Sequence, residues 1–280
     1  MKAAPVSPRS NTGRERGVVT KQDKSSETLS PEQLTELLRL IKGADTVELK
    51  LSVADENRRS AVTALGMDPL DAEVRQVVFF DTPDLVLDRH GVVVRARRVQ
   101  RKADDSVVKL RPVVPENLAP SLRRSPAFGV EVDAMPGGFV CSASMKARLK
   151  QGDVRDVLAG RRPIRRLFTK AQRALFTVHG PDGVGLDDLT CLGPINVLKL
   201  KFSPRGLERR LVAELWNYPD GSRILELSTK CTPGDAFQAA AELRAFLGGR
   251  GVDLAGSQMT KTRTALELFS RELLTTAEAK

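Results

Sequence analysis

Charged residues recur at alternate positions in this sequence, and their types match the chemistry of phosphate and of divalent metal ions. The pairs are Glu48/Lys50, Arg95/Arg97, Lys109/Arg111, Glu131/Asp133 and Lys199/Lys201, and a sixth segment carries Glu226 and Lys230 four positions apart. Lysine and arginine bind phosphate oxygens, arginine in a bidentate manner. Carboxylate oxygens suit the hard cations Mg²⁺ and Mn²⁺. Together these residue types predict a site for a multiply charged anion and a divalent metal.

Aliphatic residues fill the positions between these charges, as in Val47-Glu48-Leu49-Lys50-Leu51. Such alternation predicts strands with one apolar and one ionic face. Two arrangements fit the pattern. The first is an ordinary antiparallel sheet whose charges face water, and the second is a barrel whose charges line a wet lumen while helices cover its apolar outside. The repeated choice of Lys or Arg instead of Ser, Thr or Gln favours the barrel, but the pattern alone leaves both open.

Helical signals frame the strands. Ser30-Pro31-Glu32-Gln33 forms a capping box with proline in the first turn, which predicts a helix that ends at Gly43. Further helices are expected over residues 55–65, from about 261 to 275, and after Asp235, the last with Phe237, Ala240, Leu243 and Phe246 on one side. Residues 1–30 are rich in Ser, Thr, Pro, Lys and Arg and are expected to form a disordered basic tail, so residues 31–280 are predicted to be a single domain.

Composition limits the possible functions. The 280 residues include 45 Lys and Arg against 35 Asp and Glu, and the net charge of +10 favours a polyanionic partner. Aromatic residues make up only 4%, which disfavours single-stranded nucleic acid as that partner. The two histidines, His90 and His179, stand beside predicted turns and exclude a multi-histidine metal centre. Three widely spaced cysteines, with no membrane-length apolar run and no signal-peptide core, predict a soluble protein of the reducing cytoplasm.

Motifs in a fixed order extend the charge pattern over about residues 45–270. The strand Thr46–Lys50 is followed by the hairpin sequence Phe79-Phe80-Asp81-Thr82-Pro83-Asp84-Leu85, by Gly91 and the Arg95-x-Arg97 strand, and then by Lys109 and the acidic strand. An expected basic strand, Lys170-Ala171-Gln172-Arg173, and the pair Thr260-Lys261 complete the order. In this order the segments resemble the CYTH family, also called triphosphate tunnel metalloenzymes, with its E-x-E-x-K, Y-Y-D-T-P-D-L, R-x-R and K-x-x-R motifs. That family includes thiamine triphosphatases, inorganic tripolyphosphatases and class IV adenylate cyclases.

The resemblance implies an α+β fold, with a closed antiparallel barrel of about eight strands and helices packed outside it. It implies that Lys50, Arg95 and Arg97 are catalytic, and that further substrate contacts come from Lys109, Arg111, Arg173, Lys199, Lys201, Lys230 and Lys261. Mg²⁺ or Mn²⁺ would be held by Glu48, Glu131, Asp133 and Glu226. The expected ligand is inorganic triphosphate, thiamine triphosphate or a nucleoside triphosphate, and the expected reaction is its hydrolysis or cleavage.

The acidic part of the family pattern is depleted. Thr46 stands where the family has the first Glu of its opening motif. The family's closing acidic pair corresponds either to Lys199 and Lys201 or to the strand Ile224–Lys230, which keeps one Glu. Glu214 either compensates in part for the missing carboxylates or is a solvated strand residue. These departures affect catalysis more than binding. They leave three alternatives to a triphosphatase, namely a non-catalytic polyphosphate or nucleotide receptor, a class IV adenylate cyclase and a basic nucleic-acid-binding module.

Overall fold

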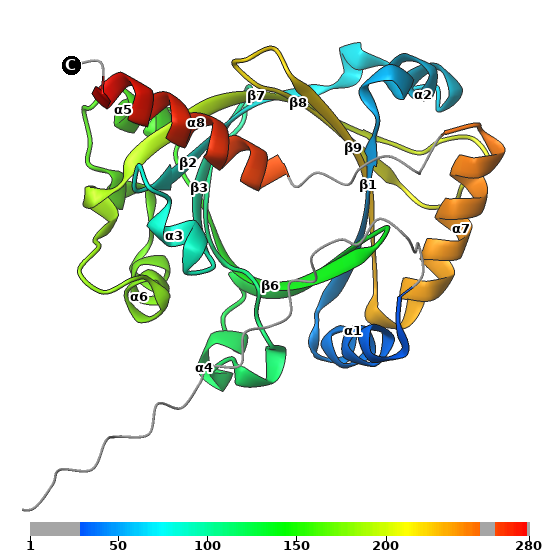
Figure 1. Cartoon of the computed structure of the whole chain (residues 1–280), viewed down its shortest axis with the longest axis horizontal. Coiled ribbons are helices and arrows are strands. Elements are labelled where there is room, and N and C mark those ends of the chain that lie inside the picture. Colours follow the sequence, from blue (N-terminus) through cyan, green and yellow to red (C-terminus); the bar gives the residue numbers. More distant parts are fainter. Residues whose placement is uncertain (1–28, 253–260, 279–280) are drawn as a thin grey trace, which may run out of the picture.

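Nine strands form a closed barrel in a computed structural model that describes residues 29–252 and 261–278 (Figure 1). The order around the barrel is β1-β5-β6-β4-β3-β2-β7-β8-β9. The strands are β1 (Thr46–Val53), β2 (Glu73–Asp81), β3 (Val92–Val99), β4 (Asp105–Leu110), β5 (Phe128–Met135), β6 (Gly138–Arg148), β7 (Thr190–Phe202), β8 (Leu211–Asn217) and β9 (Arg223–Cys231). The basic tail expected over residues 1–30 lies outside the described residues up to residue 28.

The closed barrel expected from the sequence is confirmed, and its strand count differs from the expected eight in a way that changes one pairing. Neighbouring strands that all run antiparallel must alternate in direction, and an odd number of strands cannot alternate all the way round a closed barrel. At least one neighbouring pair must therefore be parallel. That pair is β1 and β5, and it places Glu48 opposite Asp133 and Thr46 opposite Glu131.

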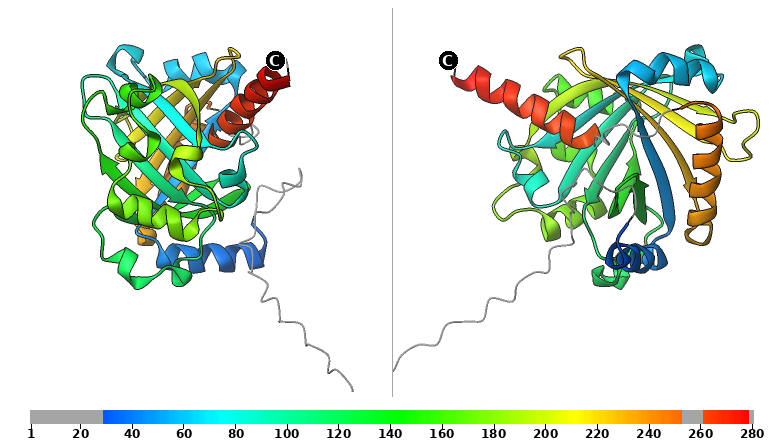
Figure 2. Two further views of the ribbon diagram at one scale, coloured as in Figure 1. Left: turned by 90° about the vertical axis from the view of Figure 1, so that its left-hand side faces the viewer. Right: turned by 45° about the vertical axis from the view of Figure 1, so that its right-hand side comes forward.

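Helices surround the barrel, and α8 lies across one of its ends (Figures 1 and 2). They are α1 (Pro31–Gly43), α2 (Arg58–Ala64), α3 (Val86–Arg89), α4 (Pro120–Arg123), α5 (Asp153–Leu158), α6 (Lys170–His179), α7 (Ala236–Gly249) and α8 (Lys261–Glu278). In the part of the chain that is described, no helix combines the length and the apolar character needed to cross a membrane.

The hydrophobic core lies mainly outside the barrel wall. Along β1 the residues Val47, Leu49, Leu51 and Val53 are buried, and they pack with residues of α1, α2 and α7. A second cluster joins β3 and β4 to α3, α5 and α6. A third lies beneath α8 and includes lumen-facing side chains of β2, β7 and β8. Because the aliphatic faces of the strands are covered from outside, the alternating charged residues point inward, as the barrel interpretation predicted.

The ends of the helices agree with the sequence better than their faces do. The capping box of α1 is present, since Ser30 Oγ accepts a hydrogen bond from the Gln33 amide at 3.2 Å and Gln33 Oε1 accepts one from the Ser30 amide at 2.9 Å. The predicted face of α7 was correct at Leu243 and wrong at Phe237 and Ala240, which are exposed, and the buried stripe is Ala236, Ala239, Leu243 and Leu247. Packing against the barrel selects this stripe.

The prediction of a basic strand at Lys170–Arg173 was also wrong, because these residues form the first turn of α6. Thr169 caps this helix by accepting a hydrogen bond from the Gln172 amide at 3.2 Å. The Gln172 side chain is fully buried and donates to the backbone oxygens of Ser106 and Met145, both at 3.1 Å, which fixes α6 on the outside of the barrel. Arg173 is consequently outside the lumen and donates to the Phe168 carbonyl at 2.6 Å.

Candidate functional site

The barrel encloses a strongly cationic cavity of about 390 Å³. Eleven Lys and Arg side chains line it together with four Glu side chains. The cations are Lys50, Arg75, Arg95, Arg97, Lys109, Arg111, Lys146, Lys199, Lys201, Lys230 and Lys261, and the acids are Glu48, Glu131, Glu214 and Glu226. A cavity lined by one sign of charge concentrates ions of the opposite sign, so the tunnel is suited to a multiply charged anion.

The structure brings together every candidate residue from the sequence except Arg173. Asp133 lies directly behind the cavity wall and contacts lining residues. Sequence reasoning missed Arg75 and Lys146, both of which line the tunnel. A signal for each was present, because Glu73 and Arg75 alternate with aliphatic residues on β2, and Lys146 continues the inward alternation of Ser142 and Ser144 on β6.

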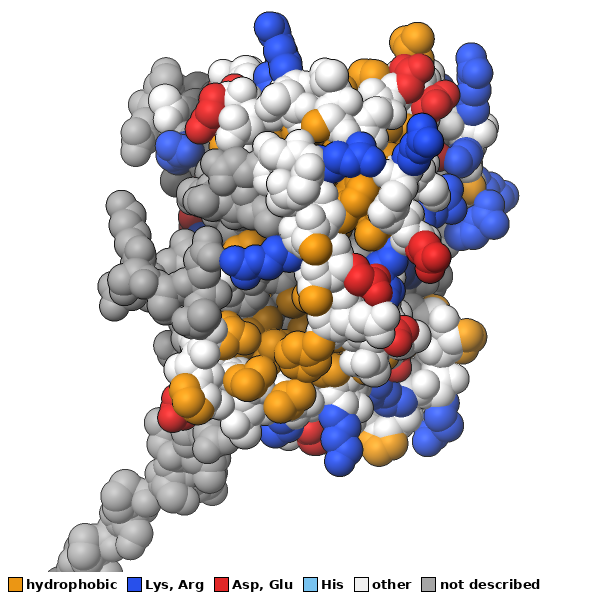
Figure 3. All heavy atoms as spheres, turned by 90° about the vertical axis from the view of Figure 1, so that its right-hand side faces the viewer, with side chains coloured by type: hydrophobic (Ala, Val, Ile, Leu, Met, Phe, Trp, Pro, Cys, Tyr) orange, Lys and Arg blue, Asp and Glu red, His pale blue; other side chains and the backbone are white. Residues whose placement is uncertain are grey.

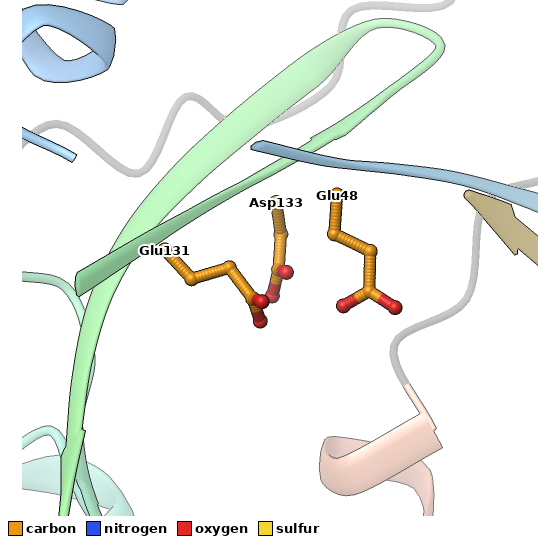
Figure 4. A group of neighbouring side chains, drawn as sticks. All are labelled: Glu48, Glu131 and Asp133. Carbon is orange, nitrogen blue, oxygen red and sulfur yellow. The ribbon is translucent and has the colours of Figure 1, made fainter. Parts of the chain in front are cut away.

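Three carboxylates form a cluster on one wall of the tunnel (Figure 4). Glu48 projects from β1, and Glu131 and Asp133 project from β5, with one oxygen of each within 4.8 Å of the others. The parallel pairing of β1 with β5 brings them together. Three carboxylate oxygens at this spacing are a donor set that suits Mg²⁺ or Mn²⁺. Both oxygens of Asp133 are buried, and three cations of the tunnel wall lie around them.

Asp133 is the most enclosed of the three acids, with an exposed fraction of 0%. The Lys50 ammonium lies 2.9 Å from Oδ1, and Lys109 and Arg111 lie 3.7 and 3.6 Å from Oδ2. Burial acts against the charged carboxylate, but these three cations outweigh it and hold the pKa of Asp133 well below its usual range. Burial acts to lower the pKa of Lys50, but Asp133, Glu48 and Glu226 outweigh it and raise that pKa. Asp133 and Lys50 are therefore both charged at neutral pH.

Lys230 lies beside the other two acids of the cluster. Its ammonium forms an ion pair with Glu131 and lies 3.9 Å from Glu48. Ser228, two residues earlier on β9, donates a hydrogen bond to Glu48 Oε1 at 3.1 Å. Burial lowers the pKa of Lys230, but Glu48 and Glu131 outweigh that effect and raise it. The donor set fits a divalent cation, and the protein supplies an ammonium next to the same oxygens.

Arg95 and Arg97 on β3 form an arginine wall of the tunnel, and the strands β6 and β4 separate it from β5. Arg97 Nε donates to both oxygens of Asp105, at 2.8 and 3.1 Å. Arg95 forms no ion pair with any described residue, and its buried Nε has no hydrogen-bond partner there. Burial, reinforced by Arg97, lowers the pKa of Arg95 to about 10. An enclosed polar group without a hydrogen-bond partner is energetically costly, so the Nε of this half-buried guanidinium is suited to receive an anion.

Lys109 behaves in the same way on the next strand. Burial lowers the pKa of its ammonium to about 8, even though Asp133 acts in the opposite direction. Its Nζ lies 3.7 Å from Asp133, at the edge of ion-pair distance. Lys109 and Arg95 are therefore the lining cations whose pKa values fall furthest below their ordinary values.

Glu214 belongs to a separate ion-pair chain near α8. Its carboxylate accepts hydrogen bonds from Lys199 at 2.7 Å and from Lys261 at 2.6 Å, and Lys261 also lies 2.6 Å from Glu226. Burial opposes the charge of Glu214, but Lys261 and Lys199 outweigh it and keep its pKa well below the usual range. Glu214 is thus enclosed and not solvated. The predicted metal ligand Glu226 is held by Lys261 and lies outside the three-carboxylate cluster.

The position of β9 bears on the two possible alignments of the closing acidic pair. This strand pairs with β1, and Lys50 lies opposite Ser228 while Glu48 lies opposite Lys230. The inward residues of β9 are therefore one carboxylate, one hydroxyl and one ammonium. Lys199 and Lys201 lie on β7, which is separated from β1 by β8 and β9.

Comparison with known proteins finds similarity in structure only. No known family profile and no curated protein sequence matches the chain. A protein from Hippeastrum, described as an adenylyl cyclase candidate with a dominant triphosphatase activity, aligns with a TM-score of 0.58 and 16% identity over 78% of this chain and 93% of that one. An adenylate cyclase candidate from Bacillus halodurans aligns with a TM-score of 0.53 and 14% identity, over 78% of this chain and 98% of that one. The chain therefore has the barrel fold of these proteins, which the resemblance to the CYTH family predicted.

Proposed function

We propose that this barrel protein, which shares its fold with triphosphatase and cyclase structures, binds a triphosphate-containing small molecule and cleaves it with a divalent metal. The ligand classes are inorganic triphosphate, thiamine triphosphate and nucleoside triphosphates. The observation that carries the proposal is the arginine wall, because Arg95 is half-buried, its Nε is fully enclosed, and it forms no ion pair with a described residue. A three-carboxylate cluster in the same cavity supplies the complementary metal ligands.

Each tunnel residue has a definite role in this proposal. Arg95 and Arg97 bind the oxygens of the phosphoryl group that is transferred, and Lys50, which lies beside Glu48 and Asp133, neutralises charge that develops in the transition state. Further phosphate contacts come from Lys109, Arg111, Lys199, Lys201, Lys230 and Lys261. A divalent cation held by Glu48, Glu131 and Asp133 would supply Lewis-acid stabilisation of phosphate oxygens. Glu226 acts through Lys261, which it holds in place.

A non-catalytic receptor for polyphosphate or nucleotides is the second candidate. Lys230 favours it, because an ammonium beside Glu131 and Glu48 balances carboxylates that a metal-dependent hydrolase would use for its cation. Such a receptor binds its ligand without metal and does not turn it over. A class IV adenylate cyclase is a further enzymatic alternative. Because the chain has three free cysteines, we propose that the protein works in the reducing cytoplasm, whichever of these functions it has.

The test is a measurement of phosphate and pyrophosphate release from tripolyphosphate, thiamine triphosphate, ATP and GTP, with Mg²⁺, Mn²⁺ or a chelator, and of cyclic AMP formation from ATP. Glu48→Gln removes one carboxylate of the cluster, and Glu56→Gln is the matched control because Glu56 is exposed on the outside of the protein. Metal-dependent phosphate release that is lost only in Glu48→Gln supports the triphosphatase. Tight tripolyphosphate binding without turnover supports the receptor instead, and pyrophosphate with cyclic AMP supports the cyclase.

A further inference from the structure

The two ends of the tunnel differ. At one end α8 packs Ala265, Leu266 and Phe269 against Trp216 and Val77, so apolar side chains fill the lumen there. Of the residues that line the cavity, the exposed ones are Lys146, Lys201 and Lys230. These three lysines mark the place where the cavity meets solvent, so the open mouth of the tunnel is cationic.

A row of basic residues leads outward from this mouth along β6. Lys146 lines the cavity, and Arg148 and Lys150 follow it at intervals of two residues. The alternate residues Met145 and Leu149 pack into the cluster outside the barrel. Since side chains of a strand alternate between its faces, Lys146 and Arg148 lie on the lumen-facing side of β6, and Lys150 follows two residues past the end of that strand. All three are exposed.

The residues of this row have no acid within ion-pair distance among the described residues, although Glu131 acts on Lys146 from farther away. No ion pair within 4 Å involves Lys146, Arg148 or Lys150 in residues 29–252 and 261–278. Asp105, which lies opposite Arg148, is held by Arg97. By contrast, four arginines farther along the chain are paired with acids, namely Arg155 and Arg161 with Asp156, Arg162 with Asp153, and Arg165 with Asp187.

The surroundings reinforce the same sign of charge. Residues 148–173 contain nine Lys and Arg and two Asp. The only aromatic residue among them is Phe168, which is buried and so offers no surface on which a base could stack. Basic and acidic side chains are interspersed on the face of the molecule that carries α7 (Figure 3), so a cationic surface of this kind is not a general property of the exterior.

From these observations we infer that Lys146, Arg148 and Lys150 form an exit track for a linear inorganic polyphosphate whose end lies in the tunnel. The inference rests on the proposed function, because the tunnel holds the terminal phosphates. It extends that function to a ligand longer than a triphosphate, with the additional phosphates outside the barrel. Polyphosphate is favoured over single-stranded nucleic acid because the track offers cations alone and no stacking side chain.

The experiment compares the affinity of the full-length protein for tripolyphosphate and for long-chain polyphosphate by titration calorimetry. Arg148→Gln with Lys150→Gln removes two unbalanced charges, and Arg155→Gln with Arg161→Gln removes two charges that are paired with Asp156. We expect the first variant to lose about tenfold in affinity for the long chain. Its affinity should also depend less steeply on salt, because a complex with fewer phosphate contacts releases fewer counterions when it forms. We expect both variants to bind tripolyphosphate within about twofold of the unaltered protein, and the second variant to keep its long-chain affinity as well.

Several outcomes would overturn the exit track. Equal losses in the two variants would show that the overall charge of the surface, and not the row on β6, determines affinity. Unchanged long-chain affinity in Arg148→Gln with Lys150→Gln would show that the chain does not follow β6. A single-stranded oligonucleotide that binds as tightly as polyphosphate, with the same dependence on these residues, would assign the track to nucleic acid. The proposed tunnel function fails separately, if the unaltered protein binds the long chain through Arg148 and Lys150 but does not bind tripolyphosphate.

Discussion

The Lys230 ammonium forms an ion pair with Glu131 and lies 3.9 Å from Glu48, and these are two of the three carboxylates that could hold a metal. In the CYTH family, which the sequence resembles, the closing strand carries a second acidic pair. Here the strand β9 places a hydroxyl and an ammonium beside the cluster instead, at Ser228 and Lys230. The balance between this ammonium and a divalent cation distinguishes the enzyme from the receptor.

Replacing Lys230 by Gln should strengthen metal binding to the cluster. The change removes a positive charge that competes for Glu131 and Glu48, and an ion pair of a half-exposed side chain contributes up to about 1 kcal/mol, or about fivefold in affinity. Mn²⁺ binding followed by electron paramagnetic resonance measures this directly, without turnover. Lys201→Gln is the matched control, since Lys201 is an exposed lining residue that forms no ion pair in the described part of the chain. An unchanged or weaker Mn²⁺ affinity in Lys230→Gln would contradict the competition.

Replacing Asp133 by Asn should destabilise the fold strongly. The change leaves Lys50, Lys109 and Arg111 enclosed without their shared counterion, and breaking a buried ion pair on one side typically costs about 3–5 kcal/mol. Urea denaturation measures the loss in the free energy of unfolding. Glu131→Gln should cost about 1 kcal/mol or less, because the side chain of its partner Lys230 is 49% exposed. Similar losses in both variants would show that Asp133 does not hold these cations together.

Anion affinity should fall as the pH rises through about 8, because Lys109 loses its proton near that value. The same loss of a proton from Lys109 affects the stability of the fold in the opposite direction. The pKa of Lys109 is below its ordinary value of 10.5, so the unfolded chain binds more protons and the contribution to stability grows between about pH 8 and 10.5. Tripolyphosphate titrations from pH 7 to 9 test the first statement. Lys109→Arg, which stays protonated, should remove the dependence, and a dependence that persists in this variant would assign the titration to another group.

Reversing two charges of the arginine wall should abolish anion binding. In Arg95→Glu with Arg97→Glu, carboxylates replace the cations at the position where we place the phosphates, and like charges repel there at low dielectric. Arg173→Glu is the control, since Arg173 lies on α6 outside the lumen and should leave the affinity for tripolyphosphate within about twofold. Circular dichroism would establish that the double variant is folded. Tripolyphosphate binding that survives in the folded double variant would reject the tunnel as the binding site.

Much of the fold was determined by local properties of the sequence. Alternation along Val47-Glu48-Leu49-Lys50 identifies a two-faced strand, because successive side chains of any strand point to opposite sides. The capping box at Ser30 and Gln33 identifies the start of α1 for an equally local reason. A second capping box, at Thr169 and Gln172, could also have been recognised in the sequence, and it would have placed Arg173 on a helix.

Which charges meet was decided only by the tertiary structure. The sequence shows that Glu48 and Asp133 lie on ionic faces, but their approach depends on a barrel with nine strands and one parallel pair. Likewise, Glu214 and Glu226 are both inward-facing acids, and only the position of α8 gives both of them Lys261 as a partner. The physical reason is that strand alternation is set within a few residues, whereas strand order, register and helix docking depend on contacts between segments far apart in the chain.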